Sequence, residues 1–375
     1  MVLGLILFKR EGQLVDWDAH YMSLALQLAS TAQGQTSPNP LVGAVLVKNN
    51  EIVGFGAHLK AGGPHAEINA LKMAGDQARE ATLYVTLEPC HHHGKTPPCT
   101  EAVIAAGVKR VVIATTDPNP IVRGRGIERL KAAGLDVTVG VGQKEAEKLN
   151  EVFNHYIVHR RPFVTLKTAT TLDGKIATSS GESQWITGEE ARHDVHLLRR
   201  HQDAILVGIN TVLKDNPRLT ARLKGGSRQP VRVVLDSSLK IPLDANLLDT
   251  HDAPTWIFTT QQASEEKKKH LEQKGVKVFI TNEGPTVDIE RMLTILGEEG
   301  ITSLLVEGGS EVNASFLYGG YAQKLVAYLA PKLIGGKTAP GAFGGPGIQA
   351  LAESVSLRDV QVEWIGQDLK VVGYF

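Results

Sequence analysis

Short apolar strands alternate with helices along the whole chain, and this rhythm constrains the fold more than any other feature. Strands in the first half are predicted at residues 41–47, 51–57, 81–87, 110–115 and 135–139, and helices at 65–73, 100–106 and 127–133. Strands in the second half are predicted at residues 163–169, 204–208, 231–236, 255–259, 277–280, 303–307 and 324–329. Alternation of this kind is typical of sheets covered by helices. We therefore expect an α/β fold in both halves.

The chain is long enough for two domains. Its 375 residues exceed what one hydrophobic core usually organises, since domains commonly hold roughly 100–200 residues. A polar helix is predicted at residues 143–158, and Arg160-Arg161-Pro162 ends it just before a fresh strand begins at Phe163. We therefore predict a first domain at residues 15–145, a linker at 146–162 and a second domain at 163–375.

The balance of charge argues against a nucleic-acid partner. Lysine plus arginine and aspartate plus glutamate both number 40, so the formal net charge is zero, whereas nucleic-acid-binding domains usually have a basic excess. Two cysteines are too few for a disulfide framework, and no apolar run approaches the roughly 20 residues that span a bilayer. We expect a cytoplasmic protein with no membrane partner, in which residues 1–14 form an extension or a short strand.

Three possible zinc ligands and one carboxylate occur together in the first domain. His65 and Glu67 open a predicted helix, and Cys90 and Cys99 flank one loop. A catalytic zinc site takes about three nitrogen or sulfur ligands and keeps one position open for water, whose pKa the metal lowers. Helix positions i and i+2 do not share a face, so we expect His65 and the two cysteines as ligands and Glu67 as the proton shuttle. Zinc nucleobase deaminases divide the work in this way.

The spacing of the cysteines leaves alternatives open. Zinc nucleobase deaminases usually place their cysteines two residues apart, whereas eight residues separate Cys90 from Cys99. His91, His92 or His93, which lie in that interval, could replace one of the ligands. A closed structural zinc site or two unrelated buried thiols would also fit the pattern.

A glycine-rich junction in the second domain indicates a nucleotide site. The predicted strand at 303–307 runs into GGSEVN at residues 308–313, which opens a helix. Glycines let backbone N–H groups approach a ligand closely, and a helix N-terminus favours phosphate. The segment is not Gly-x-Gly-x-x-Gly, however, and a tight structural turn explains it equally well.

These motifs and several others resemble the bifunctional riboflavin-biosynthesis deaminase–reductases. In the first domain the similar segments are TSPNPLVG at 36–43, HAE at 65–67, TLEPC at 86–90, GKTPPC at 94–99 and DPNP at 117–120. In the second domain they are KTATTLDGK at 167–175, GESQWIT at 181–187, LLR at 197–199, NTV at 210–212 and DNPRLT at 215–220. The resemblance covers nearly the whole chain after residue 15, and that family carries a long insertion between its two cysteines.

The resemblance implies a fold and two consecutive reactions. A cytidine-deaminase-like three-layer α/β/α domain would hold one Zn²⁺ per chain and hydrolytically deaminate 2,5-diamino-6-(5-phosphoribosylamino)pyrimidin-4-one. A dihydrofolate-reductase-like α/β domain would then use NADPH to reduce the ribosyl group, which yields 5-amino-6-(5-phospho-ribitylamino)uracil. The expected partner is therefore a small phosphorylated pyrimidine, and we expect the chain to form a homo-oligomer.

The resemblance also implies roles for individual residues. Contacts to the deaminase substrate would come from Asn39, His58, Lys95 and Asn119. Contacts to NADPH would come from Ala169, Trp185, Thr211, Asp215, Ser237, Gly309, Ser310, Glu311, Val312 and Asn313. Contacts to the ribosyl substrate of the reductase would come from Lys167, Ser183, Arg199, Leu219, Arg222 and Glu307.

Ordinary structural roles remain open for some of these residues. Asn39 and Asn119 also fit turn positions. Lys95 fits a solvated loop and Trp185 fits the core. Arg199 could lie on a helix surface, although a guanidinium matches phosphate with paired donors.

Three rival hypotheses make different predictions. A base editor acting on nucleic acid would show a basic groove and aromatic stacking residues, whereas aromatic residues make up only 5% of this chain. A zinc-stabilised binding protein would use four protein ligands and leave no position for water. A chain in which only the deaminase works would have lost parts of its second domain, yet Lys167 and the Gly308-Gly309 pair are present.

Overall fold

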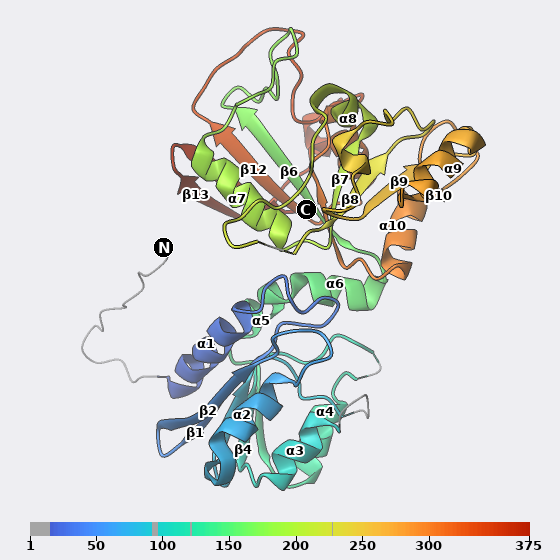
Figure 1. Cartoon of the computed structure of the whole chain (residues 1–375). Coiled ribbons are helices and arrows are strands. Elements are labelled where there is room, and N and C mark those ends of the chain that lie inside the picture. The colour runs from blue at the N-terminus through green and yellow to red at the C-terminus, as the bar shows by residue number, and fades with distance from the viewer. Residues whose placement is uncertain (1–15, 92–96, 121, 227) are drawn as a thin grey trace. The chain divides into compact units, whose positions relative to one another are not determined.

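The chain divides into two compact units, Met1–Val158 and His159–Phe375 (Figure 1). The computed structural model describes residues 16–91, 97–120, 122–226 and 228–375, so the extension or strand expected at residues 1–14 lies outside the described residues. No helix in the described ranges is both long and apolar enough to cross a lipid bilayer.

A single sheet organises the described residues of the first unit. Its strands are β1 (Gly43–Lys48), β2 (Glu51–Ala57), β3 (Thr82–Val85), β4 (Arg110–Ile113) and β5 (Asp136–Val139). Their spatial order is β2-β1-β3-β4-β5. Strand β1 runs antiparallel to β2 and β3, whereas β3, β4 and β5 are parallel. The carboxyl ends of β3 and β4 therefore meet at one edge, where parallel sheets usually carry their sites.

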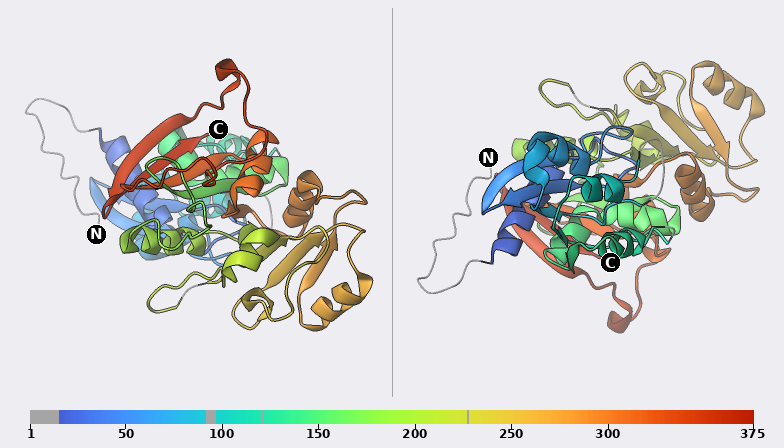
Figure 2. Two further views of the ribbon diagram at one scale, coloured as in Figure 1. Left: turned by 90° about the horizontal axis from the view of Figure 1, so that it is seen from above. Right: turned by 90° about the horizontal axis from the view of Figure 1, so that it is seen from below.

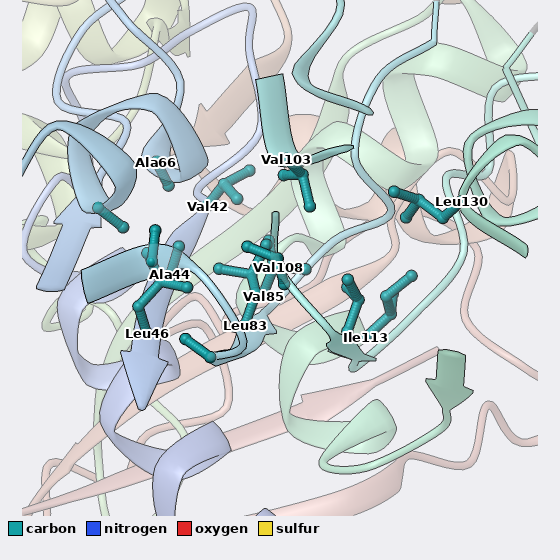
Figure 3. Close-up of a cluster of buried hydrophobic side chains, with 14 of the residues drawn as sticks. Val42, Ala44, Leu46, Ala66, Leu83, Val85, Val103, Val108, Ile113 and Leu130 are labelled. Atoms are coloured by element: carbon teal, nitrogen blue, oxygen red, sulfur yellow. The ribbon is translucent and has the colours of Figure 1, made fainter. Parts of the chain in front are cut away.

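Helices cover both faces of this sheet. They are α1 (Trp17–Ser30), α2 (Ala66–Ala74), α3 (Cys99–Ala105), α4 (Arg125–Ala132) and α5 (Gln143–Leu149). Side chains alternate between the faces of a strand, so Leu83 packs with Ala66, Val103 and Leu130 from α2, α3 and α4 (Figure 3). Its neighbour Tyr84 packs in another cluster with residues of α1 and α5. The predicted three-layer α/β/α arrangement is confirmed.

Helix α2 lies unusually close to β2, and this contact sets where the helix begins. A Cβ atom at Gly56 would lie 2.6 Å from the carbonyl oxygen of Ala66 and 2.6 Å from Cβ of Asn69. Only a residue without a side chain permits this approach. The start of α2, which carries His65 and Glu67, is therefore pressed against the sheet.

The polar helix predicted at residues 143–158 is two helices, α5 and α6 (Glu151–His159). Asn150 separates them because it leaves helical geometry, with φ −104° and ψ 21°. Its side chain pairs with the backbone of Leu41, which donates to Asn150 Oδ1 at 2.7 Å and accepts from Nδ2 at 2.9 Å. Ala146 is fully buried in the cluster that contains Tyr84. Residues 146–150 therefore pack within the first unit.

A larger sheet organises the second unit. The described strands are β6 (Phe163–Thr171), β7 (Ala204–Gly208), β8 (Val231–Leu235), β9 (Thr255–Thr259), β10 (Lys277–Ile280), β11 (Ser303–Val306), β12 (Lys324–Ala330), β13 (Arg358–Ile365) and β14 (Asp368–Tyr374). Their order is β10-β9-β8-β7-β11-β6-β12-β14-β13. The first seven strands in this spatial order, from β10 at the edge to β12, are parallel. Strand β14 pairs antiparallel with both β12 and β13.

Helices pack on both faces of this sheet as well. They are α7 (Glu189–Arg200), α8 (Ile209–Asp215), α9 (Glu265–Gln273), α10 (Ile289–Glu298) and α11 (Ser310–Tyr318). Residues of α10 and α11 share one core with the strands, and residues of α8 and α9 share another. The helix predicted to follow the Gly308-Gly309 junction is α11, whose N-cap is Gly309.

The hairpin β13–β14 is absent from the sequence-based expectation. Figure 2 shows these red strands on the opposite side of the unit from the yellow and orange α9 region, in agreement with the strand order. A signal was available, because Val360, Val362 and Trp364 alternate with polar residues before a Gly366 turn. The alternating side chains are exposed.

Candidate active sites

Three possible metal ligands converge at the edge of the first sheet. His65 is the N-cap of α2, Cys90 follows β3, and Cys99 is the first residue of α3. Nδ1 of His65 lies 3.2 Å from Sγ of Cys99 and 3.6 Å from Sγ of Cys90. All three ligand atoms lie within 4.8 Å of one another, and no other group of this kind occurs among the described residues. One nitrogen and two sulfurs fit a catalytic zinc site that keeps a position for water.

The two thiols are in different environments. A hydrogen bond from Cys99 lowers the pKa of the Cys90 thiol to about 4, and the backbone N–H of Cys99 also donates to Cys90 Sγ at 3.3 Å. The thiolate is the form of cysteine that binds metal. The first turn of α3 therefore favours the ligand form of Cys90.

Glu67 lies in the first turn of α2, and only 3% of it is exposed. Burial raises the pKa of its carboxyl group to about 7, and the charge on Cys90 adds to the shift. A carboxyl group with a pKa near neutrality can both take and give a proton at physiological pH. Its position beside the His65–Cys90–Cys99 triad suits the proton shuttle predicted from the sequence.

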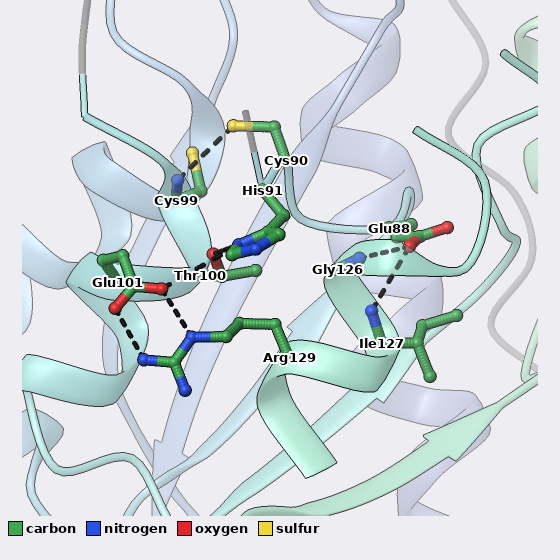
Figure 4. A network of polar contacts seen from close by, with 9 residues as sticks. All are labelled: Glu88, Cys90, His91, Cys99, Thr100, Glu101, Gly126, Ile127 and Arg129. Atoms are coloured by element: carbon green, nitrogen blue, oxygen red, sulfur yellow. Dashed lines mark hydrogen bonds and ion pairs between the residues drawn. The ribbon is translucent and has the colours of Figure 1, made fainter. Parts of the chain in front are cut away.

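His91 points away from this triad. Its Nδ1 lies 3.2 Å from Oγ1 of Thr100 and 3.8 Å from Oε1 of Glu101 (Figure 4). Glu101 in turn accepts two hydrogen bonds from Arg129, at 2.7 and 2.8 Å. The alternative ligands His92 and His93 and the candidate Lys95 lie outside the described residues.

Two of the candidate deaminase substrate residues contact each other. Nδ2 of Asn39 lies 3.1 Å from Nε2 of His58, and Nδ1 of His58 lies 3.0 Å from the carbonyl oxygen of Pro64. The His58 ring also meets His65 edge to face, at 5.4 Å between centroids. Burial lowers the pKa of His58, so a neutral ring accepts from Asn39 and donates to Pro64. Asn39 and His58 are thereby held beside a metal ligand.

Asn119 belongs to a turn between β4 and α4. Its N–H donates to Oδ1 of Asp117 at 2.8 Å, and its carbonyl oxygen accepts from the N–H groups of Val122 and Arg123, both at 2.9 Å. The backbone of Asn119 therefore helps to form the turn, which agrees with the alternative that Asn119 is a turn residue.

A cavity of about 690 Å³ opens in the second unit at the carboxyl ends of β6, β7 and β11. The candidate residues that line it are Lys167, Ala169, Ser183, Trp185, Arg199, Thr211, Asp215, Leu219, Arg222, Glu307, Gly309, Ser310 and Asn313. Three candidates do not line it. Ser237 accepts a hydrogen bond from Val287 N at 3.3 Å, Glu311 accepts one from Gly345 N at 3.4 Å, and Val312 packs in the core.

Glu307 is the centre of a buried charge cluster in this cavity. Its carboxylate accepts from Arg199 Nε at 2.6 Å and Nη2 at 3.0 Å, and Lys167 Nζ lies 3.6 Å away. Burial opposes ionisation of Glu307, but the charges of Arg199 and Lys167 outweigh it and lower its pKa to about 2. Nη1 of Arg199 donates to the carbonyl oxygen of Thr220 at 3.2 Å. Arg199 is therefore an interior residue whose fork grips a carboxylate.

Trp185 is 63% exposed and so does not belong to the core. The guanidinium of Arg192 lies 4.8 Å from the centre of its ring, which is a cation–π contact. Arg192 also donates to the carbonyl oxygen of Thr187 at 2.8 Å. An exposed indole at the rim of a cavity is a good platform for a flat ring.

Comparison with known proteins decides the family. Residues 15–115 match the cytidine and deoxycytidylate deaminase zinc-binding region, and residues 162–371 match the RibD C-terminal domain. The riboflavin biosynthesis protein RibD of Aquifex aeolicus is 49% identical over 94% of this chain and 97% of its own length. The chain belongs to the RibD family. It is a bifunctional deaminase and reductase of riboflavin biosynthesis.

Solved RibD structures share the fold over nearly the whole chain. RibD of Acinetobacter baumannii is 37% identical, covers 95% of this chain and 98% of its own, and superposes with a TM-score of 0.86. The Thermotoga maritima structure is of a diaminohydroxyphosphoribosylaminopyrimidine deaminase/5-amino-6-(5-phosphoribosylamino)uracil reductase. It is 39% identical, covers 95% and 98%, and has a TM-score of 0.83. The predicted combination of a deaminase-like and a reductase fold is therefore confirmed.

Several residues that line the cavity of the second unit were not predicted from the sequence. Arg192, His196, Lys214 and Arg218 line the reductase cavity. Burial and the nearby charges of Arg199 and Arg222 lower the pKa of His196 to about 4. His196 lies three residues before Arg199, on the same face of α7, and that spacing was a usable signal.

Proposed function

We propose that the first unit hydrolyses 2,5-diamino-6-(5-phosphoribosylamino)pyrimidin-4-one and that the second reduces its deaminated product with NADPH to 5-amino-6-(5-phospho-ribitylamino)uracil. The arrangement of Glu67 beside His65, Cys90 and Cys99 carries the first half of this proposal. The cavity around Lys167 and Glu307 supports the second. The name of the Thermotoga maritima relative gives the two substrates of that protein.

In the deaminase step, Glu67 moves the protons. Zinc bound by His65, Cys90 and Cys99 would supply a Lewis acid that lowers the pKa of water. Glu67 takes a proton from the attacking water and passes it to the departing amino group. The carbon–oxygen bond forms, the carbon–nitrogen bond breaks and ammonia leaves. We propose that Asn39, His58, Lys95 and Asn119 hold the substrate.

In the reductase step, this chain orients a sugar carbon toward the cofactor. NADPH would supply the hydride, and an open carbonyl or imine form of the sugar would accept it. We propose that NADPH contacts Ala169, Trp185, Thr211, Asp215, Ser237 and residues 309–313. We propose that the ribosyl substrate contacts Lys167, Ser183, Arg199, Leu219, Arg222 and Glu307. Within the second set, Arg222 is the residue that we propose for the phosphate. Burial and the positive charges of Arg199 and Arg218 destabilise its charged form and lower its pKa. An anion would relieve this crowding of cations.

We also propose a homo-oligomeric state, a cytoplasmic location and two domains, the second at residues 163–375. Of the linker expected at 146–162, residues 146–150 pack with the first domain, so the proposed connection is 151–162. Two free thiols that face one histidine support a reducing compartment. Size-exclusion chromatography with light scattering would test the oligomeric state.

The deciding experiment incubates the full-length protein with the diaminopyrimidine ribosylamine phosphate, with and without NADPH. Ammonia release and NADPH absorbance are followed together. We expect ammonia in both mixtures and NADPH oxidation only after deamination has begun. A zinc-loaded protein that releases no ammonia from this compound would refute the proposed substrate.

A further inference from the structure

The carboxylate of Glu88 accepts hydrogen bonds from four backbone N–H groups. Oε1 accepts from Gly126 at 2.8 Å and from Ile127 at 3.2 Å (Figure 4). Oε2 accepts from Asp117 at 3.1 Å and from Gly124 at 3.0 Å. Only 4% of Glu88 is exposed. A carboxylate offers about four acceptor positions, so these bonds account for its capacity.

The two oxygens have different tasks. Oε1 caps the first turn of α4, whose N–H groups have no partners within the helix. Oε2 joins Asp117 to Gly124, the two ends of a turn whose described residues are 117–120 and 122–124. Within this turn the carbonyl oxygen of Asn119 accepts from Val122 and Arg123. One oxygen atom of Glu88 therefore closes the turn that presents Asn119.

The backbone of Glu88 and Pro89 contacts the two segments that flank this turn, one before it and one after it. Glu88 N donates to the carbonyl oxygen of Thr115 at 3.0 Å. A Cβ atom at Gly126 would lie 2.1 Å from the carbonyl oxygen of Pro89, so the start of α4 rests directly on that peptide. Pro89 is followed by the metal ligand Cys90. The segment that leads from β3 to Cys90 therefore contacts the chain on both sides of the 117–124 turn.

We infer that Glu88 is a positioning residue of the deaminase, which holds the 117–124 turn against the metal loop so that Asn119 meets the substrate. The inference rests on the proposed function of the first unit and of Asn119. Glu88 itself touches neither the substrate nor the metal ligands in this role. Its effect passes through the backbone of the turn.

The test replaces Glu88 by glutamine in the full-length protein. Glutamine has nearly the same shape, but its NH₂ group donates, so it faces N–H groups that need an acceptor. Misplacement of a binding group by about 1 Å can cost up to roughly 10²-fold. We expect the KM of the deaminase to rise at least about tenfold with a smaller fall in kcat. Zinc content and reductase turnover of the deaminated substrate should stay at the wild-type level.

Glu101→Gln is the matched control. It removes an acceptor that joins α3 to α4 through Arg129 and leaves the four bonds of Glu88 in place. We expect its deaminase KM to stay within about twofold of wild type, since a partly exposed ion pair near the surface contributes little. A second measurement, amide hydrogen exchange of peptides covering 117–127, should show faster exchange in Glu88→Gln than in Glu101→Gln.

A double variant separates positioning from stability. If Glu88 acts through Asn119, then Glu88→Gln combined with Asn119→Ala should raise KM no further than the worse single variant. Additive effects, an unchanged KM, or loss of zinc and of the fold of the first unit would each overturn the inference. If wild-type protein does not deaminate the pyrimidine, the proposed function fails, whereas the hydrogen-exchange comparison still decides whether Glu88 orders the turn.

Discussion

Arg199 grips Glu307 through two hydrogen bonds, from Nε to Oε1 at 2.6 Å and from Nη2 to Oε2 at 3.0 Å. Its remaining terminal nitrogen donates to the backbone of Thr220. Arg199, predicted from the sequence as a contact of the reductase substrate, therefore directs three of its five N–H donors to the protein itself. Arg199 fixes the carboxylate that also faces Lys167, so we expect it to act on the reductase through Glu307 in addition to the substrate contact proposed above.

Replacing Arg199 by lysine should weaken the reductase selectively. Lysine keeps the positive charge but cannot donate the paired bonds of a guanidinium, so Glu307 loses its orientation. We expect the KM for the reductase substrate to rise while the deaminase rate stays unchanged. Steady-state NADPH oxidation and ammonia release measure the two activities. Arg228→Lys is the control, because Arg228 pairs with Asp203 outside the cavity. An unchanged reductase KM in Arg199→Lys would contradict the prediction.

The buried charge cluster should also make the stability of the second unit depend on acid. The folded-state pKa of Glu307, about 2, is below its ordinary value of 4.5. Its contribution is therefore fully present above about pH 4.5 and is lost as the pH falls toward 2. Between pH 7 and pH 3, this amounts to about 2 kcal/mol of unfolding free energy.

Glu307→Gln tests this dependence. The variant should be less stable than wild type at pH 7, because it leaves buried cations without a counter-charge. The difference should shrink as the pH approaches 3. Urea unfolding at each pH, followed by a probe in the second unit, measures it, with Glu298→Gln, an exposed residue, as the control. A difference that stays constant from pH 7 to pH 3 would show that Glu307 does not titrate as described.

The sequence predicted those features that depend on local pattern. The strands from β1 to β12 follow from apolar patterns, whereas β13 and β14 were not predicted. His65, Cys90 and Cys99 follow from the few chemistries that zinc accepts. The break between α5 and α6 depends on Leu41, a partner 109 residues from Asn150. The grip of Arg199 on Glu307 spans 108 residues. Such pairings become visible only when the fold brings the residues together.

Glu88 shows the same limit from another side. In the TLEPC segment, only Cys90 has a side chain whose metal chemistry is recognisable from the sequence. The four donors to Glu88 are backbone groups of residues 117–127, which have no side-chain signature. A buried carboxylate that is bound only by backbone N–H groups is therefore hard to predict from the sequence. The one local indication is the glycine at 126, where a side chain would collide with Pro89.

The metal should depend on both cysteines. Purified protein should contain about one zinc per chain, as the donor set of one histidine and two thiolates indicates. Cys90→Ala and Cys99→Ala should each lose it, together with ammonia release, because two protein ligands hold zinc poorly. NADPH oxidation with the deaminated substrate should persist. Elemental analysis of the purified variants gives the answer, and zinc-free protein that still deaminates would refute the site.

The sharpest test of the two-unit scheme is Glu67→Gln. The amide keeps the shape of the side chain and cannot carry the proton, so deamination should fall by roughly 10²–10⁴-fold or more. Zinc should remain, because His65, Cys90 and Cys99 are unchanged. NADPH oxidation should continue at the wild-type rate on the deaminated substrate and should stop on the diamino compound. Glu80→Gln, an exposed residue of the same unit that pairs with Lys109, should leave both rates unchanged.

Each outcome for Glu67→Gln has a distinct meaning. Retained ammonia release would show that another group moves the proton. Loss of zinc would place Glu67 among the ligands, against the geometry in which Nδ1 of His65 and the two thiols already converge. Loss of NADPH oxidation on the deaminated substrate, in protein that stays folded, would mean that the units share a conformational change. Independent rates are expected because the metal triad and Glu67 lie in Met1–Val158 and the reductase cavity in His159–Phe375.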